Sequence, residues 1–403
     1  MKILVIHEIS YLKKVVYEVH EFPELLNIKG HEITFVDFDE GAKISELSLP
    51  RDRSIRGRVH DNATIRLVTP HRFGISSIDR YWAIFSSLPI FWKLIRKGGF
   101  DVILNYAVPT YGLQVVLLGK FFGVPVLQRV LDVSSEIRNS IWNPLIAIFE
   151  KLCFHFATRV STNNPAMTRY VKSLNPKIEA EKISMHYPPL DRQFFLPQPR
   201  DHDLAKSLGL TIEDKVIVYM GSFFYFSGLD KVISVFADKL KLHPEVKLLL
   251  IGGGEQDTQL RQLVKKRNLS NNTLFTGFVP FQDLAKYLCL GDVAINPLEI
   301  SNVASSAFPN KVLQYMAVGL PTVSTKLDGL YAAFGDTSGI RWVTNPGSTV
   351  DAALEIMALN TTDRNEQIRK QSETLDHLFS PSVTVAKLEH TLSELCESRR
   401  SSD

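Results

Sequence analysis

The sequence of 403 residues contains little cysteine and no long apolar run. Its three cysteines, Cys153, Cys289 and Cys396, are odd in number and widely spaced, which argues against a disulfide framework and against a thiolate metal site. No apolar stretch approaches the roughly 20 residues that cross a bilayer, and the apolar start at residues 1–6 is too short for a signal peptide. We therefore expect a cytoplasmic protein, and a peripheral position on the inner face of a membrane remains open.

Motifs of several enzyme classes are also missing. The first apolar segment is followed by H-E-I-S-Y at residues 7–11 instead of a G-x-G-x-x-G turn, which argues against a dinucleotide-dependent dehydrogenase. The patterns G-x-x-x-x-G-K-[ST], H-E-x-x-H and G-x-S-x-G do not occur, which removes the main support for a kinase, a zinc protease or a serine hydrolase. The net charge of +3 is too small to indicate a nucleic-acid partner. We expect no cofactor, no bound metal and no nucleic acid.

The composition that is present fits a folded protein of two domains. Apolar residues make up 45% and charged residues 22% of the chain, and its length exceeds that of one ordinary domain. Prolines cluster at Pro188, Pro189, Pro197 and Pro199, where a helix or a central strand is disfavoured. We predict a first domain at residues 1–190, a linker at 191–204, a second domain at 205–380, and a last helix at 381–403 that packs back on the first domain.

Short apolar segments alternate with helical patterns in both halves. Residues 2–6 indicate a buried strand, and the helix expected at 15–29 ends where Gly30 can adopt a left-handed cap. This alternation predicts parallel sheets covered on both faces, whose strand ends form a ligand-binding crevice. Further strands are expected at residues 33–36, 64–68, 102–104, 126–130, 159–161, 183–185, 216–220, 246–251, 273–275, 293–296 and 322–324.

A helix with clear boundaries is predicted at residues 309–318. Pro309 suits the first helical position, and Gly319 suits the left-handed position after the last turn. The unpaired amides at the helix start, together with Lys311, are typical of an anion site that accepts a diphosphate. Gln314 lies three residues further on and is expected on the same helix face. An ordinary core helix with a solvated lysine would give the same local pattern.

The segment F-P-N-K-V-L-Q-Y-M-A-V-G-L-P-T-V-S-T at residues 308–325 resembles the retaining, family 4 type of glycosyltransferase with the GT-B fold. Members of that family, of the bacterial surface polysaccharide and glycolipid type, often read P-x-K-x-x-E-Y-M-A-x-G-x-P-V here. The resemblance implies an α/β fold of two Rossmann-like, doubly wound domains that face each other across a cleft. It continues in order through Y-M-G-S at 219–222, S-G-L at 227–229, L-I-G-G-G-E at 250–255, F-T-G-F-V at 275–279 and G-D-V-A-I-N-P at 291–297.

The resemblance also implies where a nucleoside-diphosphate sugar, the donor substrate, is bound by the second domain. The family's base-binding turn corresponds to Gly277, Phe278 and Val279. Its phosphates lie between the loop after Gly221 and the start of the helix. There, Pro309 and Asn310 contact the donor, and Lys311 is expected to stabilise charge on the leaving diphosphate.

This chain departs from the family at two places in the donor site. The family's paired carboxylates, which are eight positions apart, correspond to Ser306 and Gln314. Gln314 can still hydrogen-bond the ribose hydroxyls through its amide, but without the charge that strengthens such bonds. Many relatives have an arginine and a lysine where this chain has Ser222 and Ser227, so the stabilisation of the diphosphate must come from Lys311, from helix-start amides or from the other domain.

Candidates for catalysis in the first, acceptor-side domain follow the strand at residues 126–130. Asp132 is our candidate for orienting or deprotonating the acceptor hydroxyl, although it would serve equally well as a loop cap. Glu136 and Arg138 are weaker candidates. His7, after the first strand, is more often structural than catalytic at such a place.

A basic and aromatic segment at residues 78–97 is the remaining feature. Its apolar residues have near-helical spacing interrupted by Pro89, and Arg96 and Lys97 follow them. Such a segment suits a membrane surface with a lipid-linked acceptor, and a core helix with solvated basic residues is the alternative.

The function that these observations predict is the transfer of a sugar, with retention, to a hydroxyl of a glycan or lipid-linked acceptor in polysaccharide or glycolipid synthesis. A catalytically weak GT-B protein that binds a nucleotide sugar or supports a partner is the alternative, because the family's carboxylates are missing. An epimerase acting on the nucleotide sugar would need no acceptor.

Overall fold

The computed structural model describes residues 1–39, 51–70, 76–133 and 142–400, and the chain divides into two compact units. The first unit combines Met1–Pro189 with Pro381–Asp403, and the second unit is Leu190–Ser380. The last helix, α16 (Pro381–Arg400), therefore belongs to the first unit, although the chain enters it from the second. Residues 191–204, expected as a linker, begin the second unit, where they include the short helix η3 (Arg192–Phe194).

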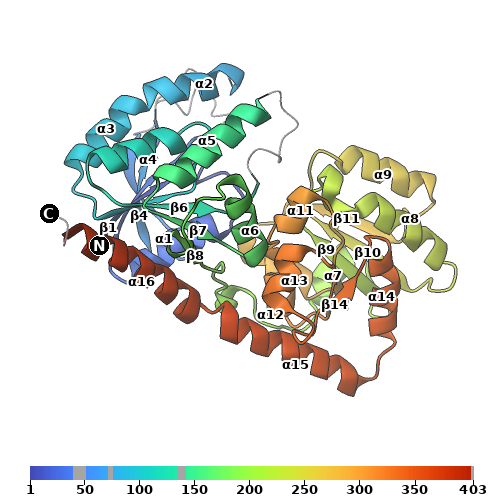
Figure 1. The fold of residues 1–403 in the computed structure, drawn as a ribbon. Coiled ribbons are helices and arrows are strands. Elements are labelled where there is room, and N and C mark those ends of the chain that lie inside the picture. Colours follow the sequence, from blue (N-terminus) through green and yellow to red (C-terminus); the bar gives the residue numbers. More distant parts are fainter. Residues whose placement is uncertain (40–50, 71–75, 134–141, 401–403) are drawn as a thin grey trace. The chain divides into compact units, whose positions relative to one another are not determined.

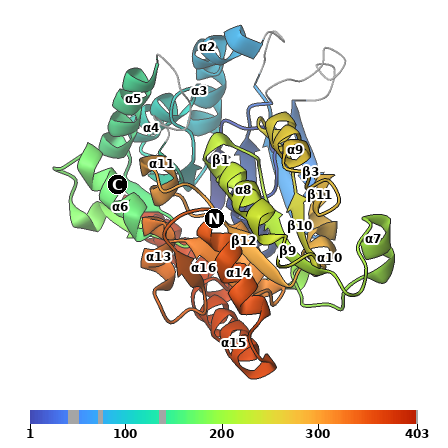
Figure 2. The same cartoon turned by 90° about the vertical axis from the view of Figure 1, so that its right-hand side faces the viewer.

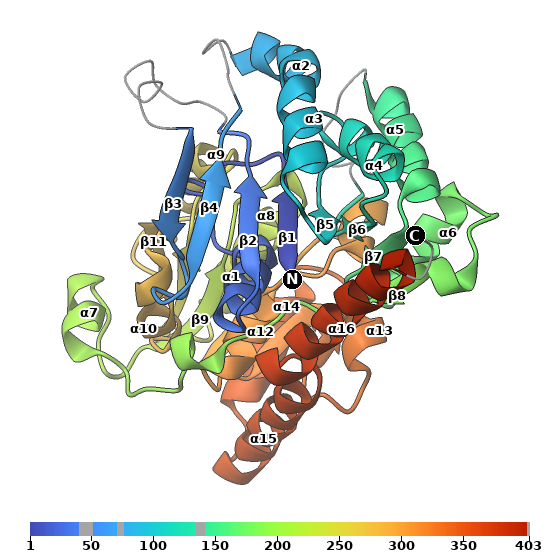
Figure 3. The same cartoon turned by 90° about the vertical axis from the view of Figure 1, so that its left-hand side faces the viewer.

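The sheet of the first unit has eight strands in the order β3-β4-β2-β1-β5-β6-β7-β8. β3 pairs with β4 in antiparallel fashion, and the other described pairs are parallel. Figure 3 shows β3, β4, β2 and β1 side by side. The bounds are β1 (Lys2–Ile6), β2 (Glu32–Val36), β3 (Asp52–Arg56), β4 (Thr64–Val68), β5 (Val102–Asn105), β6 (Val126–Val130), β7 (Arg159–Thr162) and β8 (Ile183–Met185).

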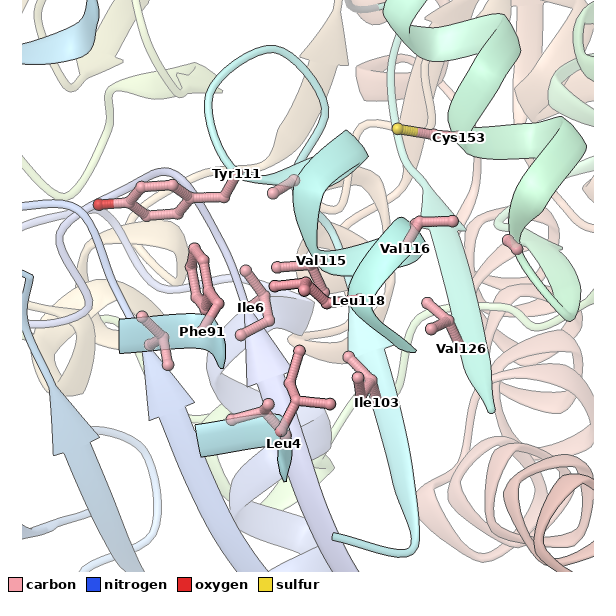
Figure 4. Packing of buried hydrophobic residues seen from close by; sticks show 14 of the residues in the cluster. Leu4, Ile6, Phe91, Ile103, Tyr111, Val115, Val116, Leu118, Val126 and Cys153 are labelled. Atoms are coloured by element: carbon pink, nitrogen blue, oxygen red, sulfur yellow. The ribbon is translucent and has the colours of Figure 1, made fainter. Parts of the chain in front are cut away.

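Helices cover both faces of this sheet because side chains of successive strand residues point to opposite faces. Leu4 and Ile6 of β1 pack into one core with helices α2 to α6, as Figure 4 shows in part, whereas Ile3 and Val5 pack into a second core with α1 and α16. The sheet is therefore buried on both faces (Figure 1). The helix bounds are α1 (Glu18–Ile28), α2 (Ser76–Ser86), α3 (Leu88–Lys97), α4 (Gly112–Phe121), α5 (Asn143–Phe156), η2 (Ala180–Lys182) and α6 (Pro165–Leu174).

The sheet of the second unit is parallel and has the strand order β11-β10-β9-β12-β13-β14. Its order reverses between β9 and β12, and this reversal is where doubly wound sheets bind ligands, outside the carboxyl ends of the strands. The bounds are β9 (Lys215–Met220), β10 (Val246–Ile251), β11 (Thr273–Gly277), β12 (Val293–Asn296), β13 (Thr322–Thr325) and β14 (Arg341–Val343).

Helices also cover both faces of the second sheet. α8, α9 and α14 share one core with the strands, and Figure 2 shows α8 beside α14. On α15, Gln371 accepts a hydrogen bond from Thr322 N and donates one to Leu320 O, which fixes this helix to the start of β13 beside α12. The bounds are α7 (His202–Ser207), η4 (Tyr225–Ser227), α8 (Leu229–Lys239), α9 (Asp257–Lys266), η5 (Phe281–Asp283), α10 (Leu284–Leu288), α11 (Asn302–Ser306), α12 (Lys311–Ala317), α13 (Asp328–Phe334), α14 (Ser348–Met357) and α15 (Thr361–Leu378).

Candidate functional site

Three glycines bring the ends of three strands together at the carboxyl edge of the second sheet. Gly221, Gly252 and Gly277 follow or end β9, β10 and β11, and each has a φ angle in the range that favours glycine, between 74° and 138°. A Cβ atom on Gly252 would lie 2.1 Å from Gly221 O, and Gly252 N donates to Gly277 O over 2.9 Å. Because no side chain fits between these strand ends, their backbone lines this part of the edge.

Lys311 lies beside this glycine turn. Its Nζ is 4.1 Å from the centroid of the Tyr219 ring, and it would lie 3.2 Å from a Cβ atom on Gly221. Desolvation lowers the pKa of the half-buried Lys311 to about 7, and no carboxylate of the described residues offsets this effect. A desolvated ammonium group without a counter-ion is favourable only when an anion joins it, so this position fits a phosphate.

Two tyrosines hold Lys311 and the glycine turn in place. Tyr315, one turn after Lys311, accepts a hydrogen bond from Met220 N over 2.7 Å and donates one to Met220 O over 3.2 Å. Tyr219 donates to Ser222 O over 3.0 Å. Both rings are fully buried, so α12 is fixed to the end of β9 and to the loop that follows. We did not predict either role from the sequence, although a tyrosine four residues after Lys311 on a buried helix face was the available signal.

The helix predicted at residues 309–318 begins later, at Lys311. Pro309 is therefore not its first residue, because Val312 N bonds to Pro309 O in a tighter turn that precedes the regular helix, and Asn310 is the N-cap. The predicted left-handed cap is confirmed, since Gly319 has a φ of 77°. Gln314 lies half-buried in the middle of the helix.

The other donor-binding candidates lie at the ends of strands or in short helices of the same unit. Ser227 is buried, and its Oγ has no hydrogen-bond partner among the described residues. Phe278 is 65% exposed, and its ring packs against Gly253, where a Cβ atom would lie 3.3 Å away. Half-buried positions are taken by Ser222 after β9, Val279 after β11, Ser306 at the end of α11, and Pro309 and Asn310 before α12.

At the carboxyl edge of the first sheet, His7 follows β1 and stacks on Tyr106 after β5, with ring centroids 5.6 Å apart. Burial lowers the pKa of His7 to about 3, so this imidazole is neutral near pH 7, and it bonds to Tyr17 Oη over 3.3 Å. The Tyr106 hydroxyl is buried without a partner among the described residues. These contacts support the structural interpretation of His7.

Asp132 follows β6 on the same unit and is exposed to solvent. Partial desolvation by the surrounding protein and the nearby charge of Glu18 raise the pKa of Asp132 to about 6. A carboxylate with such a pKa can accept a proton near neutral pH, which suits a general base. Glu136 and Arg138, the weaker candidates, lie outside the described residues.

A buried ion pair that we did not predict lies behind this edge. Arg129 in β6 makes two hydrogen bonds of 2.8 Å to the carboxylate of Glu18 at the start of α1. Arg129 also donates to Ser161 Oγ, which bonds to His186 Nδ1 over 2.7 Å, and His186 Nε2 reaches Thr391 Oγ1 of α16 over 2.9 Å. This network connects the strand before Asp132 with α1 and with the carboxy-terminal helix.

Within the described ranges, no group of three or more His, Cys, Asp or Glu side chains is arranged to hold a metal ion. In the same part of the chain, no helix combines the length and the apolar character that crossing a membrane requires.

The pKa of Lys311 predicts that binding of an anionic ligand depends on pH. If the ligand requires the ammonium form, affinity is highest below pH 7 and falls by up to about tenfold for each pH unit above it. A nucleotide sugar is a suitable probe because its diphosphate diester does not titrate there, and calorimetry in buffers of different ionisation enthalpy would detect the proton taken up at about pH 8. Lys311→Arg should flatten the profile, and a flat wild-type profile would contradict this role.

Comparisons with known proteins agree with this arrangement. Residues 214–359 match the family model described as Glycosyl transferases group 1. The chain is 24% identical over 182 residues to N-acetyl-alpha-D-glucosaminyl L-malate synthase of Bacillus anthracis, covering 45% of this chain and 46% of that protein. It is 22% identical over 300 residues to a phosphatidylinositol N-acetylglucosaminyltransferase chain of Arabidopsis thaliana, covering 72% and 62%. The chain thus spans about half to three fifths of the length of these relatives.

Solved structures resemble the chain over nearly its whole length. Sucrose-phosphate synthase of Thermosynechococcus elongatus superimposes with a TM-score of 0.77 at 18% identity and covers 98% of this chain and 99% of its own. Anabaena HepE in complex with UDP superimposes with a TM-score of 0.73 at 17% identity and covers 98% and 100%. Together with the family match and the two parallel sheets, this likeness shows that the chain has the GT-B fold and that residues 214–359 are a domain of the group 1 glycosyl transferases.

Proposed function

We propose that this chain is a glycosyltransferase that moves a sugar from a nucleoside-diphosphate sugar to an acceptor hydroxyl. The observation that carries the proposal is the desolvated Lys311, which has no counter-ion among the described residues and lies beside the Gly221 turn of a group 1 glycosyl transferase domain. The reaction breaks the bond between the sugar carbon and the diphosphate oxygen, and negative charge develops on the departing diphosphate. A positively charged group fixed at that place lowers the barrier.

Lys311 bears most of this stabilisation on the second unit. Ser222 and Ser227 are neutral, so they can offer hydroxyl groups to the phosphates but no charge. The buried Ser227 Oγ, which has no partner among the described residues, is available for such a bond. The hydrogen bonds of Tyr315 to β9 keep Lys311 at a fixed place relative to the turn, which is the preorganisation that transition-state stabilisation requires.

The donor and acceptor follow from chemistry on the two units. The turn at Gly277, Phe278 and Val279 is our proposal for reading the base. UDP is the first nucleotide to test because the HepE structures contain UDP or UDP-glucose. On the first unit, Asp132 would orient or deprotonate the hydroxyl of a glycan or lipid-linked acceptor, helped by its pKa of about 6. We further propose that transfer occurs with retention, in the synthesis of a polysaccharide or glycolipid.

Gln314→Glu should tighten donor binding. A carboxylate at this position accepts two hydroxyl hydrogen bonds with charge assistance, which an amide cannot provide, and the expected gain is about threefold to tenfold in affinity. Titration of wild type and variant with the same nucleoside diphosphate measures it. Gln314→Leu, of similar size, should weaken binding, and equal affinities in all three proteins would place Gln314 away from the ribose.

The proposed function is tested by incubating the purified chain with nucleotide sugars chosen by thermal shift, because a ligand that binds the folded state raises its apparent stability. Release of the nucleoside diphosphate, or transfer of the sugar to an added acceptor, is the expected result. Binding without release or transfer would instead support the alternative of a nucleotide-sugar-binding protein. Conversion of the sugar without an acceptor would support an epimerase.

A further inference from the structure

The helices on one face of the first sheet expose large apolar side chains. Phe85 and Phe121 are 71% and 70% exposed. These side chains lie on, or directly before, α2, α3, α4 and α5, and we call this surface the α2–α5 face. Its exposed apolar residues are Trp82, Phe85, Leu88, Trp92, Leu117, Phe121, Trp142, Leu145 and Ile148.

The α2–α5 face is continuous. α2 packs on α3, α3 on α4 and α4 on α5, and all four bury their inner sides in the same core (Figure 1). The Trp92 ring of α3 lies 5.7 Å from the Phe121 ring and 4.9 Å from the Phe122 ring at the end of α4. Lys120 of α4 lies over the Phe156 ring of α5, 5.1 Å from its centroid. The aromatic contacts therefore join the outward sides of three helices.

The charges of this face have one sign on α3, α4 and α5. Glu150 is the acidic residue of these three helices, and it is buried and accepts a hydrogen bond from Tyr170. α2 contains Asp79, whose side chain lies outside the described residues. The exposed basic residues of α3, α4 and α5 are Lys93, Arg96, Lys97, Lys120 and Lys151.

The opposite face of the same unit differs in its charge. There, Glu389 of α16 pairs with Lys29, and Glu394 of α16 pairs with Arg159. Positive and negative charges thus alternate and neutralise one another on that side. The excess of positive charge on the α2–α5 face is a local property and does not follow from the net charge of +3 of the whole chain.

We propose that the α2–α5 face binds the surface of an anionic lipid bilayer. Apolar and aromatic side chains next to lysine and arginine fit the boundary between acyl chains and anionic headgroups, because the long basic side chains reach the headgroups while the rings enter the apolar layer. A second copy of this chain fits less well, since two such faces would bring cations against cations. The proposal concerns the first unit and does not depend on donor binding by the second.

Vesicle sedimentation of the full chain tests this proposal. We expect binding to vesicles of equal parts phosphatidylcholine and phosphatidylglycerol, and much weaker binding to phosphatidylcholine alone. Arg96→Glu with Lys97→Glu should lower the partition coefficient by at least about thirtyfold at low salt, since each lost cation contributes about fivefold and each new carboxylate is repelled. High salt should reduce the difference between wild type and this variant because it screens exposed charges.

The matched control is Lys265→Glu with Lys266→Glu, which makes the same charge change at two exposed residues in the last turn of α9, in the second unit. It should retain at least a third of wild-type binding. Phe85→Ser with Phe121→Ser should weaken binding to both vesicle types, including at high salt, because it removes apolar area. Circular dichroism and binding of UDP or a nucleotide sugar should stay unchanged in all variants.

Three results would overturn the proposal: no binding of wild type to anionic vesicles, equal losses in the α3 and α9 variants, or no loss in either α2–α5 variant. A concentration-dependent dimer in ultracentrifugation that Phe85→Ser with Phe121→Ser dissociates, in a protein that does not bind vesicles, would assign the face to self-association. Loss of donor binding by Lys311→Ala with intact vesicle binding separates this proposal from the proposed function.

Discussion

Lys311→Ala should lower donor affinity or turnover about tenfold to a hundredfold, because it removes a charge-assisted contact worth about 1.5–3 kcal/mol. The ammonium group beside Gly221 has no counter-ion among the described residues, so the fold keeps its charge for a ligand. A loss mainly in kcat would mean that Lys311 acts on charge that develops in the transition state. A loss mainly in affinity would mean equal contact in the ground state and the transition state.

The control for this variant is Lys247→Ala. Lys247 is also partly buried in the second unit, but it lies near the amino end of β10 and pairs with Asp214 over 3.8 Å. Its removal should leave donor affinity and turnover within about twofold of wild type, as for a paired charge far from a ligand. Calorimetry and initial rates measure both variants after circular dichroism shows that they are folded. Unchanged values in Lys311→Ala would remove α12 from the donor site.

Arg129→Leu should destabilise the protein by about 3–5 kcal/mol, because it leaves the carboxylate of Glu18 buried without its partner. The exposed fractions of the two side chains are 0% and 3%, so water cannot replace the lost hydrogen bonds. Urea unfolding followed by circular dichroism measures the loss. Glu18→Leu combined with Arg129→Leu should recover most of it, because no charge then remains buried.

Arg66→Leu is the matched control for Arg129→Leu. Arg66 also makes two hydrogen bonds to one carboxylate, that of Asp52, over 2.8 and 2.6 Å, but both side chains are about half exposed. The expected loss is about 0–1 kcal/mol. Similar losses for Arg129→Leu and Arg66→Leu would contradict the view that burial makes the Glu18 pair essential.

The sequence was sufficient to predict most of the fold because the strands of parallel sheets are continuous apolar runs. β1, β4, β6, β8, β10 and β12 have the predicted bounds. β3 was missed because this edge strand reads D-R-S-I-R, and exposed charges are how an edge strand avoids pairing with other chains. The helix expected at residues 15–29 begins at Glu18, whose side chain is held by Arg129 of β6.

The candidate site was predictable only in part. Lys311 was visible because its helix has sequence signals at both ends and a family motif between them. The contacts of Tyr219 and Tyr315, and the pair of Glu18 with Arg129, connect residues that lie 3 to 111 positions apart through side chains in the interior. Neither periodicity nor local motifs encode such contacts, because they depend on how strands and helices pack in three dimensions.

Hydrogen exchange of the full chain, with and without the nucleoside diphosphate that raises its stability most, tests the central claim most directly. Our account predicts slower exchange at the Gly221 turn, around Gly277 and at the start of α12, where ligand contacts restrict local opening. α9, on the far part of the second unit's surface, should exchange as before. Protection confined to the first unit, or bound nucleotide without any protection near Gly221 and Lys311, would contradict the assignment of the donor site.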